Sequence, residues 1–345
     1  MTAADGAPSS AFSAPAKGRF DHEGVRYRYL MWPARAKAVA APFVLLHGFA
    51  QSAASWDRVA PLLAEDRVVY ALDLVGHGGS EAPENPLPYA LDLQGEALLA
   101  FARFVNSQAI GEGAAGEGPA ASKAAPHDAA PREAAGSGTA RAREKAPRNQ
   151  SAATRPVVVG YSMGGRVALA AAVCRRDDFA ACASALVLEG AGLGPATEAA
   201  REQDAARDAK RAARLREAGV EAFMDEWERL PLFATQRALP RVVREHIRAG
   251  RLANDAEALA RTFEHAGQHA MPARHQVLTA LSALRLAGVP VLYLAGERDQ
   301  KYRALADELA DGGLCETRTI RGVGHNAHVE DPVGFARILG SVGAR

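Results

Sequence analysis

The chain has 345 residues, 48% of them hydrophobic, and a formal net charge of +1. This length accommodates one large α/β domain with an insertion, and the near-zero charge excludes a general attraction to nucleic acid or anionic lipid. Three scattered cysteines are too few for a disulfide framework or a zinc cluster, and no stretch approaches the roughly 18 apolar residues of a membrane span. We expect a cytoplasmic protein with no nucleic-acid or membrane partner; the oligomeric state stays open.

Short apolar runs and helical segments alternate along the chain. Residues 1–19 are small and Pro-rich, which predicts a disordered N-terminal extension. A half-buried strand is expected from residue 25, and further runs typical of buried strands begin at residues 43, 67, 157, 185 and 289. Helical spacing over 89–105 and 164–174 separates some of these runs. The alternation predicts an α/β fold with a mainly parallel sheet flanked by helices.

Two segments interrupt this alternation. Residues 107–155 are almost entirely Ala, Gly, Pro, Ser and scattered charges, so they bury too little apolar surface to offset the entropy of ordering, and we expect a disordered insertion. Residues 195–275 are helical in composition, with few large apolar side chains, which predicts a helical cap. The core would then comprise residues 20–194 and 276–345.

The segment 160–164 reads GYSMG and fits the pattern G-x-S-x-G, with a buried strand before it and a helix of small residues after it. The glycines permit a turn tight enough to present Ser162 at the carboxyl end of the strand. This context favours an activated serine over a Gly-rich turn that only packs a helix against the sheet.

An activated serine needs a base and a group that orients the base. Asp299 follows the strand that begins near residue 289, and His325 lies in GVGHNAH after a further short strand. Both would stand at the carboxyl ends of strands, where parallel sheets bind ligands. His328 is an alternative base and Glu297 an alternative acid.

Charge that develops on an oxygen during a reaction must meet fixed donors. The backbone N–H groups of Phe49, after the second strand, and of Met163, after the serine, are predicted to form this oxyanion hole. His47 and His77 lie in neighbouring loops, and we interpret both as structural residues that do not titrate in a reaction.

Arg166 lies one helical turn after Ser162, and its guanidinium can therefore reach the same pocket. A permanent cation there suits a carboxylate-bearing substrate, since Arg offers a planar fork of donors. The alternative is a structural ion pair with an acidic residue of the cap.

Several motifs together carry a resemblance to a known family: LHGF, DLVGHGGS, GYSMGGR, LEGAGLG, GERDQKYRALADEL and GHNAHVEDP, with Trp227 and the PLF that follows it. They resemble the 2-succinyl-6-hydroxy-2,4-cyclohexadiene-1-carboxylate synthases of menaquinone biosynthesis, which have the α/β-hydrolase fold. The likeness runs from about residue 22 to 340, without 107–155. The insertion departs from the family pattern, and EGAGLG varies the family's loop near the site.

The resemblance implies a lyase that needs no cofactor or metal. The family removes a proton beside the ketone of a succinyl side chain and expels pyruvate, so Ser162, deprotonated by His325 with Asp299 behind it, would take the proton. The substrate in this family carries three carboxylates. The alternative is a hydrolase of a carboxylate-bearing ester, thioester or carbon–carbon bond, and a non-catalytic ligand-binding fold is a third reading.

In this family, arginines of the cap also contact the substrate. Counted from Trp227, Arg248 falls at one of these positions, with Arg251 as a near alternative. The other should lie in the first cap helix, where Arg201 is our choice and Arg207 remains open. The resemblance further implies that two aromatic side chains, Tyr161 and Trp227, pack on the ring of the substrate; the alternative is that each belongs to the core.

Overall fold

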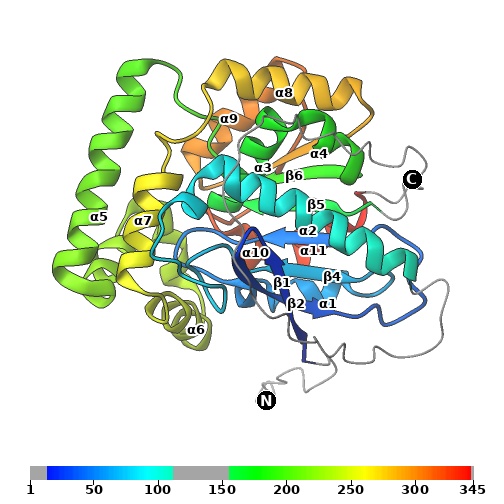
Figure 1. Ribbon diagram of the computed structural model, residues 1–345, viewed down its shortest axis with the longest axis horizontal. Helices are drawn as coiled ribbons and strands as arrows, with labels where there is room; N and C mark the ends of the chain where they lie inside the picture. The colour runs from blue at the N-terminus through cyan, green and yellow to red at the C-terminus, as the bar shows by residue number, and fades with distance from the viewer. Residues whose placement is uncertain (1–13, 112–154, 343–345) are drawn as a thin grey trace, which may run out of the picture.

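The computed structural model describes residues 14–111 and 155–342. Its centre is a sheet of eight strands in the order β1-β2-β4-β3-β5-β6-β7-β8 (Figure 1). The strands are β1 (Ala16–His22), β2 (Val25–Trp32), β3 (Phe43–Leu46), β4 (Val69–Leu72), β5 (Val157–Tyr161), β6 (Ala185–Glu189), β7 (Val291–Gly296) and β8 (Glu316–Ile320). All neighbours from β4 to β8 pair in parallel.

The burial of the parallel strands explains why they are almost entirely apolar. Every residue of β3, β4, β5, β6 and β7 is buried, because helices cover both faces of the sheet. Side chains alternate between the faces: Val44 and Leu46 join one hydrophobic cluster, while Phe43 and Leu45 join the other. The continuous apolar runs in the sequence are therefore strands buried on two sides.

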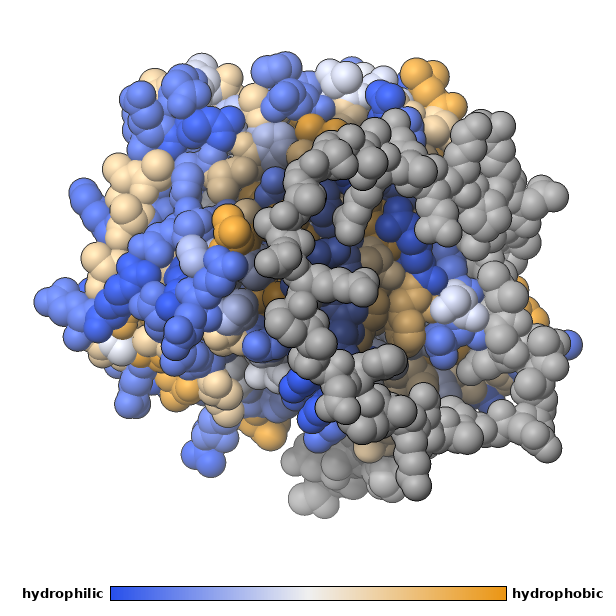
Figure 2. Space-filling view, in the orientation of Figure 1, coloured by the Kyte–Doolittle hydropathy of each residue, from blue (hydrophilic) through white to orange (hydrophobic). Residues whose placement is uncertain are grey.

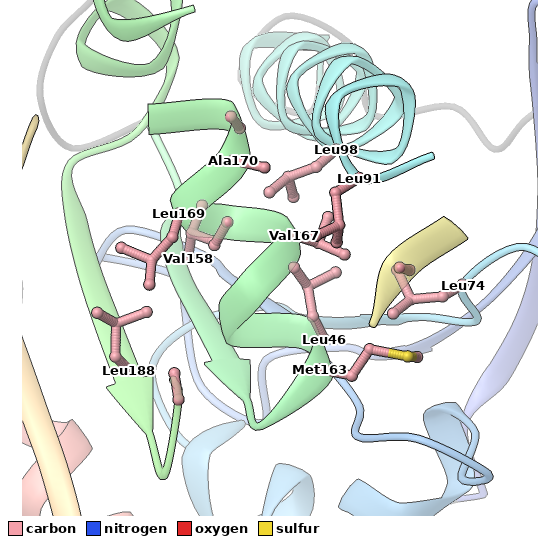
Figure 3. Close-up of a cluster of buried hydrophobic side chains, with 14 of the residues drawn as sticks. Leu46, Leu74, Leu91, Leu98, Val158, Met163, Val167, Leu169, Ala170 and Leu188 are labelled. Carbon is pink, nitrogen blue, oxygen red and sulfur yellow. The ribbon is translucent and has the colours of Figure 1, made fainter. Parts of the chain in front are cut away.

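Helices of the core divide between the two faces. The first cluster packs the sheet against α2 (Leu91–Gly111), α3 (Met163–Cys174), α4 (Arg176–Cys182), α8 (Arg274–Leu286) and α9 (Gln300–Asp311). Figure 3 shows Val158 and Leu188 from the strands close to Leu169 of α3, and Val167 of α3 close to Leu91 and Leu98 of α2. The second cluster involves the short helices η1 (Ala53–Trp56), α1 (Ala60–Leu63) and α10 (Ala327–Glu330) together with α11 (Pro332–Gly340). The short helix η2 (Leu87–Tyr89) leads into α2.

The chain between β6 and α8 forms a helical cap. It consists of α5 (Glu198–Trp227), η3 (Pro231–Ala238), α6 (Arg241–Leu252) and α7 (Ala256–Ala266). Figure 1 shows α5, α6 and α7 gathered at one end of the sheet, and Figure 2 shows mostly hydrophilic residues over that end. Arg216 of α5 bonds to Glu257 and Glu264 of α7 and so links two cap helices.

Two predicted boundaries differ from the structure. Strand β1 begins at Ala16, inside the predicted extension 1–19, because it pairs with β2 through a two-residue turn in which Glu23 and Gly24 have φ of 47° and 78°. Helix α2 continues to Gly111, inside the predicted insertion 107–155. Residues 1–13 and 112–154 of these two segments lie outside the described residues. Within the described part of the chain, no helix is long and apolar enough to cross a membrane.

Candidate active site

Ser162 stands at the sharp turn from β5 into α3. Its φ of 49° and ψ of −100° are unusual for a residue with a side chain. The neighbouring glycines make this turn possible: a Cβ on Gly160 would lie 2.6 Å from the backbone of Gly165, and one on Gly164 would lie 2.5 Å from the carbonyl oxygen of Leu46. The turn therefore requires glycine on both sides of a strained serine.

The structure brings Ser162, His325 and Asp299 together. The Nε2 atom of His325 lies 3.2 Å from the Oγ atom of Ser162, and its Nδ1 atom lies 2.7 Å from Oδ2 of Asp299. Asp299 and His325 are both buried. The carboxylate accepts from Nδ1, which leaves Nε2 free to take the proton of the serine hydroxyl.

The two alternatives considered for these roles lie elsewhere. Glu297 is exposed, and its carboxylate accepts a hydrogen bond from the backbone N–H of Gly322. His328 is fully buried, and its Nδ1 atom lies 2.7 Å from Oε2 of Glu189. Neither side chain bonds to Ser162 or His325.

Two backbone N–H groups beside Ser162 are available to a ligand. Met163 is the first residue of α3, so its N–H has no partner within the helix. Neither this group nor the N–H of Phe49 has a hydrogen-bond acceptor among residues 14–111 and 155–342. The N–H of Gly164 donates to the carbonyl of His47 at 3.1 Å and holds the two loops together. This arrangement suits an oxyanion hole.

His47 and His77 brace these loops. Nε2 of His47 accepts from the backbone N–H of Leu74 at 3.0 Å, and Nδ1 of His77 lies 3.0 Å from the carbonyl oxygen of Val75. Both rings are buried, and burial is the main cause that lowers the pKa of His77 from 6.5 to about 3. His77 is therefore neutral at physiological pH.

This pKa predicts an acid sensitivity. Between pH 6.5 and about 3 the unfolded chain binds a proton at His77 that the folded protein does not bind, so the free energy of unfolding falls as the pH falls. The contribution is at most about 1.4 kcal/mol per pH unit. Urea unfolding between pH 4 and 7 should show a shallower dependence for His77→Asn, which keeps a donor for Val75 but cannot titrate. Equal slopes for variant and wild type would contradict this prediction.

A pocket of about 880 Å³, including its open mouth, lies over Ser162 between the core and the cap. Much of its wall is aromatic or aliphatic: Phe49, Tyr161, Trp227, Leu230, Leu232, Phe233, Phe263 and Tyr302. Tyr161 and Trp227, both expected from the sequence, are among them. The wall also contains five cationic side chains and one carboxylate: Arg166, Arg207, Arg211, Arg251, Lys301 and Asp208.

Arg166 is a buried cation of this wall that makes no ion pair among the described residues. Its side chain comes from the first turn of α3, is only 9% exposed, and donates from Nη1 to the carbonyl oxygen of Ala266 at 2.7 Å. It forms no ion pair with any acidic residue in the described part of the chain, so the structural ion pair considered above is absent there. Burial lowers the pKa of its guanidinium. Asp208 of the same wall attracts the guanidinium without forming an ion pair with it. Burial of a cation outside an ion pair is costly, and an anionic ligand would relieve that cost.

The structure corrects both choices of cap arginine. Arg201 lies outside the pocket wall and donates to the carbonyls of His269 and Met271, while Arg207, left open above, lines the pocket. These arginines are six residues apart on α5 and therefore point in different directions.

A similar correction applies to α6. Arg248 reaches outward to Asp225 and Glu228 at 2.7 and 3.0 Å. Arg251, its near alternative, lines the pocket, bonds to Glu228 at 2.9 Å and lies 4.9 Å from the ring centre of Phe233. The two arginines are one turn apart, so small differences in helix position decide which one faces the ligand.

The sequence interpretation missed two pocket cations. Arg211 lies one turn after Arg207 on α5, its guanidinium 5.1 Å from the ring centre of Trp227 and 3.2 Å from Asp208. Lys301 follows Asp299 by two residues. The sequence contained a signal for both residues: Arg211 lies four residues after Arg207 on the same helix, and Lys301 lies two residues after Asp299. In the part of the chain described, no group of three His, Cys, Asp or Glu side chains could hold a metal ion.

Comparisons with known proteins agree with this geometry. Residues 43–338 match the model of the alpha/beta hydrolase family. A Bacillus subtilis (strain 168) protein, provisionally named as a 2-succinyl-6-hydroxy-2,4-cyclohexadiene-1-carboxylate synthase, is 29% identical over 320 residues, which cover 92% of this chain and 94% of that protein. The synthase of that name from Salmonella newport (strain SL254) is 37% identical over 185 residues, 54% of this chain and 67% of that protein.

Among solved structures, MenH from S. aureus matches with a TM-score of 0.69 and 25% identity, over 90% of this chain and 96% of that chain. The matches confirm the fold class and the resemblance that the sequence motifs predicted.

Proposed function

The chain belongs to the alpha/beta hydrolase family, and from this premise we propose that it is a carbon–oxygen lyase of menaquinone biosynthesis. The reaction would eliminate pyruvate from 2-succinyl-5-enolpyruvyl-6-hydroxy-3-cyclohexene-1-carboxylate to give 2-succinyl-6-hydroxy-2,4-cyclohexadiene-1-carboxylate. Relatives named for this synthase support the proposal. The site geometry supplies a base, donors for an oxyanion and cations for carboxylates.

Proton transfer would begin at the serine. Nε2 of His325 takes the hydroxyl proton of Ser162, and Asp299 stabilises the imidazolium that forms. The serine oxygen then removes the proton beside the ketone of the succinyl side chain. The electron pair of that C–H bond forms an enolate. When the enolate returns to the ketone, a ring double bond shifts and the bond between the ring and the enolpyruvyl oxygen breaks. The leaving group becomes pyruvate after it takes up a proton.

The enolate oxygen would lie between the N–H groups of Phe49 and Met163. Each donor is held in place before the substrate arrives, one by its loop and one by the start of α3. Loss of one such donor typically costs about 100- to 1,000-fold in rate. The oxyanion hole should therefore matter about as much as the base.

The main observation behind this proposal is the buried position of the Arg166 guanidinium in the pocket wall. A buried guanidinium beside the serine, in no ion pair among the described residues, has little use in an enzyme for neutral esters. A substrate with several carboxylates would supply the missing countercharge through paired hydrogen bonds. Arg207, Arg211 and Arg251 extend the positive wall toward the cap.

The two arginines of α6 provide a matched test of the cap. Replacement of Arg251 by alanine should lower kcat/KM for pyruvate release by about ten- to a hundredfold, the usual worth of a hydrogen bond to a charged group. Arg248→Ala should leave kcat/KM nearly unchanged, because its side chain lies outside the pocket. Steady-state kinetics on both variants measures the difference. A larger loss for Arg248→Ala would mean that the other face of α6 binds the substrate.

A direct assay tests the function. The purified protein is given the enolpyruvyl substrate, and pyruvate release is followed alongside hydrolysis of an activated neutral ester. Rapid pyruvate release with little esterase activity is the expected result. Rapid ester hydrolysis without pyruvate release would favour the hydrolase alternative, and the absence of both activities would exclude either enzyme.

A further inference from the structure

The corner Glu189–Gly190 follows β6, between the strands that lead to Ser162 and to Asp299. The carboxylate of Glu189 is 1% exposed, so its charge needs partners within the protein. His328 provides two of them: its backbone N–H donates to Oε1 at 3.0 Å, and its Nδ1 atom lies 2.7 Å from Oε2. This second pair of a histidine and a carboxylate has the same Nδ1-to-oxygen distance as the pair of His325 and Asp299.

The backbone of this corner contacts the supports of all three reacting residues. The carbonyl of Glu189 accepts from the N–H of the strained Ser162 at 2.8 Å. The N–H of Gly190 donates at 3.0 Å to the carbonyl of Leu294 in β7, the strand that leads to Asp299. A Cβ on Gly190, which has a φ of 54°, would lie 2.8 Å from Cε1 of His325. The ring of the base therefore rests directly against this corner.

His328 adds a second route to the same residues. Its ring stacks on Trp56, with 4.0 Å between the ring centres. The ring of Tyr161 contacts both imidazoles, 4.8 Å from the centre of His328 and 5.2 Å from that of His325. Since His328 is fully buried and does not line the pocket, it cannot touch the substrate.

We propose that Glu189 and His328 are positioning residues that hold the Ser162 turn and the His325 loop at a reactive separation. The carboxylate joins the end of β6 to the start of α10, three residues after the base. Without the carboxylate this connection between the loop and the turn is lost, and we expect the 3.2 Å separation of Nε2 and Oγ to lengthen. The inference rests on the proposed roles of Ser162 and His325 but not on the identity of the substrate.

The test measures how fast Ser162 reacts with a fluorophosphonate probe, which needs no natural substrate. In that reaction an O–P bond forms, fluoride leaves, and the hydroxyl proton passes to His325. Glu189→Leu should label about 100-fold more slowly than the wild type, the usual cost of a 1 Å misplacement. Glu189→Gln keeps a donor and an acceptor for His328 and should label at close to the wild-type rate.

His328 gives a second pair of variants in case Glu189→Leu does not fold. Asparagine places a donor where Nδ1 stands, so His328→Asn should retain most of the labelling rate while His328→Leu loses it. With the natural substrate, the slow variants should show a lower kcat and an unchanged KM, because neither residue lines the pocket. Asn106→Leu is the control, since it removes a buried hydrogen bond to the Cys182 carbonyl far from the site.

The outcomes separate this inference from the proposed function. Labelling at the wild-type rate in folded Glu189→Leu and His328→Leu would overturn the positioning role, as would an equal loss in Asn106→Leu. Failure of the probe to label Ser162 in the wild type would overturn it as well. Normal labelling of the wild type without pyruvate release would refute the lyase, and the variant rates would still decide the role of Glu189.

Discussion

Replacement of Ser162 by alanine should abolish pyruvate release, with a loss of about 10⁴-fold or more, the upper end of what a positioned proton transfer contributes. The variant lacks the oxygen proposed to remove the substrate proton, and Nε2 of His325 is placed 3.2 Å from Oγ to take up the proton of that oxygen. Pyruvate release at saturating substrate measures the effect.

The fold should survive this change. The one hydrogen bond that the Oγ atom makes to the described part of the chain is the bond to His325, and the backbone bond from Ser162 to Glu189 does not depend on the side chain. The melting temperature of Ser162→Ala should therefore stay near that of the wild type. An exposed serine, Ser107, provides the control substitution. Substantial pyruvate release by Ser162→Ala would show that another group removes the proton.

Replacement of Arg166 by alanine should weaken use of the carboxylated substrate by about 2 to 5 kcal/mol, the cost of removing one partner of a buried charge pair. This corresponds to a loss of about 30-fold to several thousandfold in kcat/KM. The loss should be specific: any slow hydrolysis of a neutral activated ester at Ser162 should change little, since such an ester has no carboxylate for the guanidinium to bind.

Further variants separate the charge of Arg166 from its geometry. Arg166→Lys keeps the cation but loses the planar fork, so it should recover only part of the activity. Arg201→Ala is the matched control, because Arg201 lies on the cap outside the pocket wall. Arg166→Met should not lower the melting temperature of the free protein, since it removes a buried charge that forms no ion pair among the described residues. A kinetically silent Arg166→Ala would refute a carboxylate clamp at this residue.

Local patterns made much of the fold predictable, and they also indicated the three residues that the fold brings together at the pocket. Apolar runs marked the parallel strands because helices bury both faces of the sheet. Ser162 was found because a strained turn needs glycines at fixed positions around it. His325 and Asp299 each follow a strand and lie at the same end of the sheet as Ser162, so their convergence follows from the topology.

The cap arginines could not be assigned from spacing alone. Arg201 and Arg207 share one helix, and only the rotation of that helix against α7 decides which one reaches the pocket. Nothing in the local sequence indicated that Ala16 belongs to a strand, because the composition around it resembles that of the residues before it. Ala16 is part of β1 because its backbone pairs with Met31 of β2. Tertiary contacts decide such positions, whereas local propensity does not.

Glu189 illustrates the same limit inside the site. It ends an apolar run, where a carboxylate would ordinarily face water, and its partner His328 is 139 residues away in the chain. The motif containing His328 indicated a candidate base, but only the fold shows that its imidazole turns toward Glu189 rather than toward Ser162.

The orientation of β5 has a practical consequence for attaching labels. Arg155 stands just before the amino end of this strand, where its guanidinium bonds to the carbonyl of Ala180, whereas Ser162 follows the carboxyl end. Five residues of strand separate the two ends by about 16 Å. A fluorophore or surface tether attached at position 155 would thus lie at the edge of the sheet opposite Ser162, and the immobilised protein would present its pocket to the solution.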